Sequence, residues 1–189
     1  MKLFSQRPAL IALGLIALMA ATRVHHFGSS LHLPDASLAV FLLAGFFITS
    51  PVLFGTLLIE AGLIDYLAIT QFNVNDYCVT PAYWFLIPTY AVLWFAGRHY
   101  ARIHQHSVRS LGVFAGLSFA AISVAFLISN GAFYLFSGRF PNMSMAEYAS
   151  RVAQYYVPYM SGAVLYLVPA VLLYVLFTHR ADTRHSEAH

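Results

Sequence analysis

The stretch LGVFAGLSFAAISVAFL, from Leu111 to Leu127, contains no charged side chain. A helix that crosses a lipid bilayer needs a run of this character. The whole chain shares it, because 60% of its 189 residues are hydrophobic and only 9% are charged, whereas soluble domains carry about 25% charged residues. A globule of this size cannot hide so much apolar surface from water. We therefore expect an all-α integral membrane protein with a single transmembrane domain over residues 1–189.

Polar breaks divide the chain into six apolar segments. We expect helices over about Arg7–Thr22, Ala36–Thr49, Val52–Ala68, Ala82–Gly97, Leu111–Leu127 (continuing toward Tyr134) and Ala146–Thr178. The last segment exceeds the roughly 20 residues that a bilayer needs, which favours one long, tilted helix with an amphipathic outer extension, bent at Pro158 or Pro169. One kinked helix over Ala36–Ala68 is the alternative to two helices separated at Ser50-Pro51, and it gives five spans.

The basic residues decide between six spans and five. With six spans and both termini inside, seven basic residues fall on the cytoplasmic side and three fall outside; the inner ones are Lys2, Arg7, Arg98, Arg102, Arg109, Arg180 and Arg184, and the outer ones are Arg23, Arg139 and Arg151. This distribution follows the positive-inside rule, whereas five spans would place the Arg98–Arg109 loop outside. Lys2 and Arg7 also precede an apolar run as in a signal peptide, but the rest of the chain is membrane-embedded too, which favours an uncleaved first helix. We expect a multi-pass protein of the bacterial inner membrane.

Cys78 is the only cysteine, and it lies in the polar break Asn75–Pro81 between two apolar segments. It cannot form a disulfide within the chain, so it is either an inert side chain or a thiol retained for its chemistry. The six-span topology places it on the outer face, which in a bacterium is oxidising.

Two charged residues and a group of aromatic and amide residues are candidates for a site near Cys78. Asp65, near the outer end of its helix, and Arg151 are placed to meet in one vestibule, either as a ligand-orienting pair or as a structural ion pair. The outer segments also contain Tyr77, Tyr83, Trp84, Asn130, Tyr134 and Tyr155. An interfacial aromatic belt explains many such residues, but a bowl lined by aromatic and amide groups also suits a large, flat ligand.

Other partners are less well supported. His25, His26 and His32 in the first outer loop leave open a transition-metal site, although their spacing matches no HExxH helix. The arginines are dispersed, which argues against nucleic acid. There is no GxxxxGK[ST] loop, so the chain carries no ATPase of its own.

Several segments together resemble a known family. They are Pro34–Val40 (PDASLAV), Pro81–Phe85 (PAYWF), Ile128–Gly131 (ISNG), Ser137–Phe140 (SGRF) and Arg151–Tyr155 (RVAQY). With Asp65 and the single Cys78, they resemble the BtuM family, solitary proteins similar to the substrate-binding S-components of energy-coupling factor transporters and implicated in vitamin B12 uptake in Gram-negative bacteria.

The resemblance implies a function and roles for single residues. It implies cobalamin binding and uptake, with Cys78 as axial ligand to the corrin cobalt, loss of cyanide from bound cyanocobalamin, and Asp65, Tyr83 and Arg151 as polar partners. It leaves open whether cyanide loss is catalysed and whether a shared energy-coupling module takes part. An importer of cobalt or nickel ions that uses the outer-loop histidines is one alternative. A non-transporting membrane assembly protein with an inert Cys78 is another.

Overall fold

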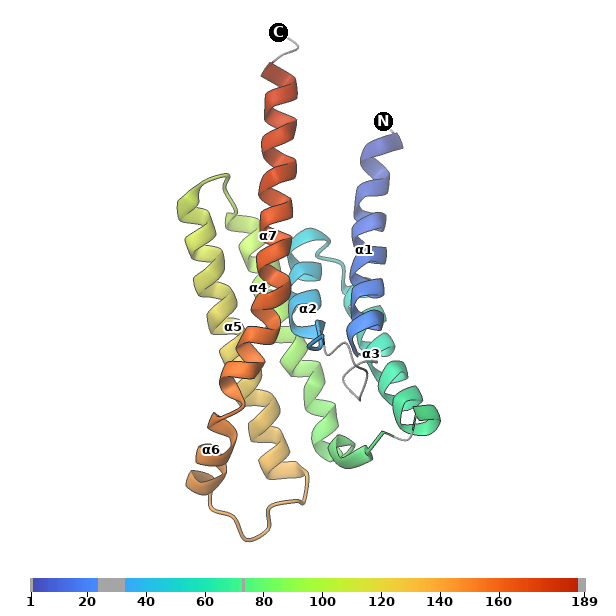
Figure 1. Cartoon of the computed structure of the whole chain (residues 1–189), viewed down its shortest axis with the longest axis vertical. Coiled ribbons are helices and arrows are strands. Elements are labelled where there is room, and N and C mark those ends of the chain that lie inside the picture. Colours follow the sequence, from blue (N-terminus) through green and yellow to red (C-terminus); the bar gives the residue numbers. More distant parts are fainter. Residues whose placement is uncertain (1, 24–32, 73, 187–189) are drawn as a thin grey trace.

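The computed structural model of the chain describes residues 2–23, 33–72 and 74–186 (Figure 1). Throughout these residues the regular structure is helical, as predicted. The elements in chain order are α1 (Lys2–Arg23), α2 (Ser37–Phe47), α3 (Pro51–Phe72), the 3-10 turns η2 (Asp76–Cys78) and η3 (Pro81–Phe85), α4 (Leu86–Ile103), α5 (Val108–Phe136), α6 (Met145–Ala153) and α7 (Tyr156–Ser186).

The helices run up and down a single bundle. The start of α1, the end of α7 and the connection between α4 and α5 lie at one end, here called the termini end (Figure 1). The turns η2 and η3, the connection between α5 and α6, and α6 itself lie at the opposite end, here called the cavity end. The charge distribution predicts that the termini end is cytoplasmic, and that assignment stays a prediction.

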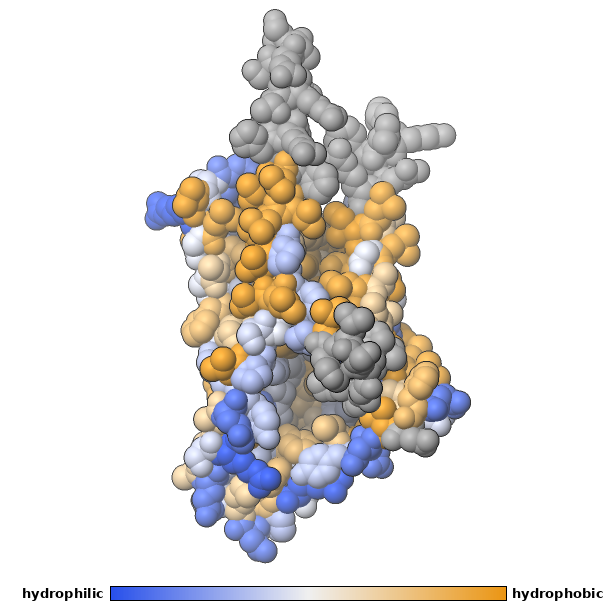
Figure 2. Space-filling view, viewed as in Figure 1, coloured by the Kyte–Doolittle hydropathy of each residue, from blue (hydrophilic) through white to orange (hydrophobic). Residues whose placement is uncertain are grey.

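Three helical segments are long and apolar enough to cross a membrane: Pro51–Phe72, Val108–Phe136 and Tyr156–Leu176. The predicted membrane character is supported to this extent, and the six-span topology stays a prediction. Pro8–Arg23 and Ser37–Phe47 are apolar but shorter, and α4 carries Arg98 and Arg102 near its end. Figure 2 shows an apolar surface along the middle of the bundle and a hydrophilic surface at the cavity end.

The core of the bundle is built around α2. Its 11 residues extend for about 16 Å, roughly half of the ~30 Å hydrocarbon core. Nearly every side is buried, from Ala39 through Gly45, as expected for a helix that is apolar all round. It packs most extensively on α4.

Two glycines allow α2 and α4 to approach so closely. A Cβ atom on Gly45 would overlap the Trp94 carbonyl oxygen, and one on Gly97 would overlap the Leu42 carbonyl oxygen. Small residues permit this backbone-to-backbone contact between helices in membranes.

The helix boundaries correct two of the sequence expectations. The alternative of one helix over Ala36–Ala68 is wrong, because α2 ends at Phe47 and α3 begins at Pro51; between them Thr49 has a φ of 53°, which ends helical geometry. The single helix expected over Ala146–Thr178 is also wrong, because the helix is interrupted between Ala153 and Tyr156. In a continuous helix the Pro158 ring would clash with the Gln154 carbonyl, whereas in the first turn of α7 proline needs no donor. The expected continuation of the fifth helix toward Tyr134 is confirmed, and α5 ends at Phe136.

Candidate functional site

A cavity of about 410 Å³ opens at the cavity end of the bundle. This volume is within the range of small-molecule pockets, roughly 300–1,000 Å³. Its walls come from the end of α1, the start of α2, α3, η2, η3, α4 and α5. The lining residues are Arg23, Asp35, Asp65, Ile69, Asn75, Cys78, Val79, Ala82, Tyr83, Leu86, Tyr90, Ser129, Asn130 and Phe133.

Cys78 is an exposed free thiol at this cavity. Local hydrogen bonds shape the turn that carries it. The Asn75 side chain accepts from the Tyr77 amide at 2.8 Å, and the Val79 amide donates to the Asp76 carbonyl at 2.8 Å. Asparagine is suited to this position because its short side chain bonds the backbone two residues on.

The surroundings of Cys78 favour the protonated thiol. Burial raises the pKa of the Cys78 thiol, the Asp65 carboxylate raises it further, and Arg139 lowers it. Because the net shift is upward, the free protein holds mostly thiol near neutral pH. A metal that binds this sulfur as thiolate must release its proton.

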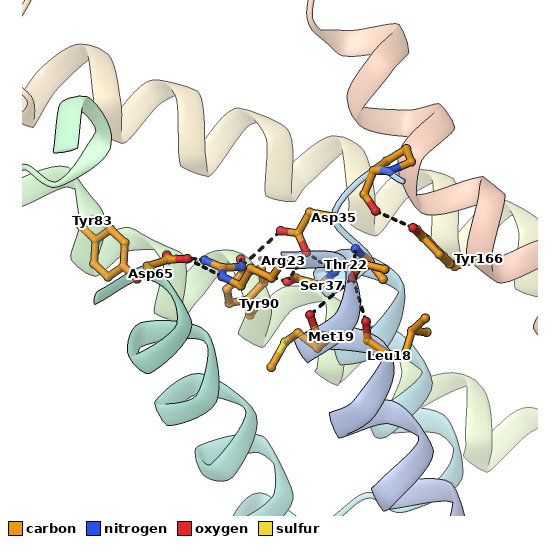
Figure 3. A network of polar contacts seen from close by, with 12 residues as sticks. Leu18, Met19, Thr22, Arg23, Asp35, Ser37, Asp65, Tyr83, Tyr90 and Tyr166 are labelled. Carbon is orange, nitrogen blue, oxygen red and sulfur yellow. Dashed lines mark hydrogen bonds and ion pairs between the residues drawn. The ribbon is translucent and has the colours of Figure 1, made fainter. Parts of the chain in front are cut away.

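Asp65 and Arg23 form the central ion pair of the site (Figure 3). Arg23 Nε donates to Asp65 Oδ1 at 2.7 Å and Nη2 donates to Oδ2 at 2.6 Å, a bidentate geometry specific to arginine. The Tyr83 hydroxyl donates to Asp65 Oδ2 at 2.7 Å. Burial and this hydrogen bond raise the pKa of Tyr83, so the phenol stays neutral. Asp65 is therefore a fixed carboxylate that accepts three hydrogen bonds.

The remaining guanidinium nitrogen of Arg23 joins further elements to this pair. Its Nη1 donates to Ser37 Oγ and to Tyr90 Oη, both at 2.9 Å, and lies 3.2 Å from Asp35 Oδ2. Asp35 Oδ1 in turn accepts from the Ser37 amide at 2.9 Å and from its hydroxyl at 2.6 Å. One arginine thus joins α1 to the start of α2, to α3 and to α4.

This network is buried and carries a net negative charge. The Arg23 side chain is only 7% exposed, against 27% for Asp35 and 15% for Asp65. Two carboxylates face one guanidinium, which leaves one negative charge in the cavity wall. Charges in such a place are tolerated only when they are paired and hydrogen-bonded.

The structure brings together four of the nine predicted site residues. Asp65, Cys78, Tyr83 and Asn130 line the same cavity. The other five lie elsewhere: Tyr77 and Arg151 line a second cavity, Trp84 and Tyr155 are 73% and 56% exposed, and the Tyr134 hydroxyl donates to the Met143 carbonyl at 2.8 Å.

The expected meeting of Asp65 with Arg151 is wrong, because Asp65 pairs with Arg23. The sequence predicts only that Arg23 is a charge of the outer loop. Arg23 is the last residue of an apolar helix, and Asp35 follows a short distance on in the chain. This position is the sequence signal for the ion pair. An arginine that ends an apolar helix is a candidate for pairing with any acidic residue at the same depth.

No bare-metal centre is found in the described part of the chain. There, no group of three or more histidine, cysteine, aspartate or glutamate side chains is placed to hold a metal ion. His25, His26 and His32, on which the metal-importer alternative depends, lie outside the described residues.

Comparison with known proteins assigns no family: no protein-family model and no curated protein matches the chain. The resemblance to the BtuM family therefore depends on the segments quoted above, and it enters the function only as a proposal.

Proposed function

We propose that this chain binds a corrinoid of the cobalamin class at the cavity end of the bundle and takes part in its uptake across the bacterial inner membrane. The Cys78 thiolate is the axial ligand to the corrin cobalt. The observation that carries this proposal is the position of the single cysteine, which lines one cavity together with Asp65, Tyr83 and Asn130.

A single sulfur ligand suits a metal that is already chelated better than a bare ion. A protein site for a free transition-metal ion usually supplies three or four ligands. In the described residues Cys78 has no such companions. A corrin ring brings its own equatorial nitrogens, so one thiolate completes an axial position. This supports a corrinoid over cobalt or nickel ions.

The charged wall of the cavity has a positioning role in this proposal. Asp65 and Tyr83 are held by Arg23 and by each other, so they present a rigid polar surface. The net negative charge there attracts a cobalt(III) corrin, which is cationic at the metal. Arg23 acts through Asp65 as a positioning residue.

Loss of cyanide follows from ordinary ligand substitution. The Cys78 thiol would release its proton to solvent, and its sulfur would bond to cobalt(III) as the nucleotide base leaves the axial position on that face. Cyanide, on the opposite face, would leave with the electron pair of its own bond to cobalt and be replaced by water, so neither cobalt nor sulfur changes oxidation state. A thiolate is a strong donor and weakens the bond on the opposite side of the metal.

The test is the visible spectrum of purified protein with cyanocobalamin added, for wild type, Cys78→Ser and Val79→Ala. Val79 lines the same cavity next to the cysteine, which makes it the matched control. We expect a new cobalt absorption band in wild type and in Val79→Ala and none in Cys78→Ser.

Two results would contradict the proposal. A Cys78→Ser spectrum identical to that of wild type would remove the ligand role. Failure of wild type to bind any corrinoid would exclude the corrinoid itself, and with it uptake.

A further inference from the structure

A second cavity of about 420 Å³ borders the turn that carries Cys78. It opens at the same end of the bundle and is lined by Tyr77, Arg139, Phe140, Pro141, Asn142, Met143, Glu147 and Arg151. The binding site set out under the proposed function does not include it, although it contains two of the chain's ten basic residues.

The two arginines of this cavity are available to a ligand. Among the described residues both ion pairs involve Arg23, so neither Arg139 nor Arg151 is in one. The only carboxylate in the lining, Glu147, accepts from the Ser144 amide at 2.8 Å and from its hydroxyl at 2.7 Å. These bonds cap α6 and lower the pKa of Glu147.

Arg139 is held in place by the residue next to Cys78. Its guanidinium lies over the Tyr77 ring, 4.5 Å from the centroid, and Nη2 donates to the Tyr77 carbonyl at 3.4 Å. A stacked guanidinium keeps its outward N–H groups free for a further acceptor.

The two cavities share a wall and have opposite charge. Tyr77 lines the second cavity and packs against Phe133, which lines the first, with ring centroids 5.8 Å apart. The first cavity has a net charge of −1 from Arg23, Asp35 and Asp65. The second has +1 from Arg139, Arg151 and Glu147. A ligand with a cationic centre and an anionic substituent would be held across this wall.

We propose that the second cavity binds the phosphate group of the ligand, with Arg139 and Arg151 as its donors. This inference rests on the proposed function. The phosphodiester of the corrinoid's nucleotide chain would lie between the two guanidiniums while the corrin metal lies against Cys78. The paired cavities then distinguish a complete cobalamin from cobinamide, which lacks the nucleotide.

The experiment measures the affinity of purified protein for cyanocobalamin and for dicyanocobinamide, at constant ionic strength. The variants are Arg139→Gln, Arg151→Gln and the double variant. Arg109→Gln, an exposed arginine beside the connection at the other end, is the matched control. A second measurement uses no corrinoid and records the thermal unfolding of the same proteins with added inorganic phosphate.

We expect the double variant to lose cobalamin affinity by about a hundredfold or more, since two charged hydrogen bonds to the phosphate are lost. Cobinamide affinity should change less than about twofold. Phosphate should stabilise wild type and Arg109→Gln but not the double variant.

Several outcomes overturn the inference. Equal losses of affinity for both corrinoids would show that the arginines do not bind the phosphate. No loss for either would show that they bind no part of the ligand. Loss of co-purified anionic phospholipid with unchanged corrinoid affinities would assign the arginines to a lipid headgroup. If wild type bound no corrinoid but was stabilised by phosphate through these arginines, the proposed function would fail while the anion site stood.

Discussion

The two ends of the bundle join α4 to its neighbours by different means. At the cavity end the link is Arg23, which donates to the Tyr90 hydroxyl of α4 and forms a buried ion pair with Asp65, beside an open cavity of about 410 Å³. At the termini end it is a cluster of rings, in which His104 Nδ1 and the Tyr100 hydroxyl are 2.9 Å apart and His104 Nε2 and the Tyr174 hydroxyl are 2.8 Å apart. Phe46 packs on three of these side chains. The void left there is only about 20 Å³.

The comparison shows which end can open at low cost. When helices shift, neutral rings in a close-packed cluster can replace one apolar contact by another. A buried ion pair cannot separate without leaving its charges unpaired in an apolar surrounding, which costs more free energy. The cavity end is therefore held by charge and already open, and if the proposed uptake takes place, passage of a ligand toward the other side would require rearrangement at the termini end. Burial lowers the pKa of His104, with His106 as a second cause. The neutral ring thus supports the fold above about pH 6.5, and this support is lost as the pH falls below that value.

Replacing Arg23 by Met is the most severe test of the difference between the two ends. The substitution leaves Asp35 and Asp65 facing each other in an apolar wall with no cation. We expect the free energy of unfolding to fall by about 3–5 kcal/mol, as for other buried pairs that lose one partner. Denaturant unfolding in detergent, followed by circular dichroism, measures it.

Arg109→Met is the control for the loss of an exposed arginine, and it should change the free energy of unfolding by less than about 0.5 kcal/mol. A loss below about 1 kcal/mol for Arg23→Met would mean that the pair does not hold the cavity end together, and the contrast between the ends would disappear.

Gly45→Ala tests the close contact of α2 and α4, which lies between the two ends. The new Cβ overlaps the Trp94 carbonyl oxygen, a backbone atom that cannot move aside alone. We expect a loss of about 1–3 kcal/mol from overpacking, measured in the same unfolding assay. In Gly112→Ala, where nothing lies within 4 Å of the new atom, the change should instead stabilise by about 0.5–1 kcal/mol. Equal effects at both positions would show that α2 and α4 are not in close contact.

Local sequence patterns predict much of this organisation. Apolar runs between polar breaks locate α3, α5 and the spanning part of α7, because a helix in a membrane is specified by its own residues. The same holds for Cys78 and Tyr83, which lie five residues apart in one outer segment and reach one cavity. The α2–α3 break is visible as Ser50-Pro51.

Local sequence patterns do not predict which charged residues pair with one another. Asp65 has several possible cationic partners at the outer end, and the one it contacts, Arg23, is 42 residues away in the chain. That choice depends on how far α1 and α3 extend toward the cavity end, which no local pattern states. The glycine contact between α2 and α4 depends likewise on helix packing. The split of α6 from α7, in contrast, does have a local signal in Pro158, which interrupts the helix where a bend is expected.

Two matched substitutions, Tyr83→Phe and Tyr174→Phe, each remove one hydroxyl and so compare a single hydrogen bond at each end of the bundle. Tyr83 donates to a carboxylate that also pairs with Arg23, whereas the Tyr174 hydroxyl contacts the neutral ring of His104. Hydrogen bonds to charged groups contribute about 1.5–3 kcal/mol and neutral ones about 0.5–1.5 kcal/mol. We expect Tyr83→Phe to destabilise more than Tyr174→Phe in the unfolding assay at pH 7.5. If Tyr174→Phe proved the more damaging of the two, the ring cluster and not the ionic network would be the firmer end of the bundle, and in the proposed uptake the end that rearranges would be the one that carries Cys78.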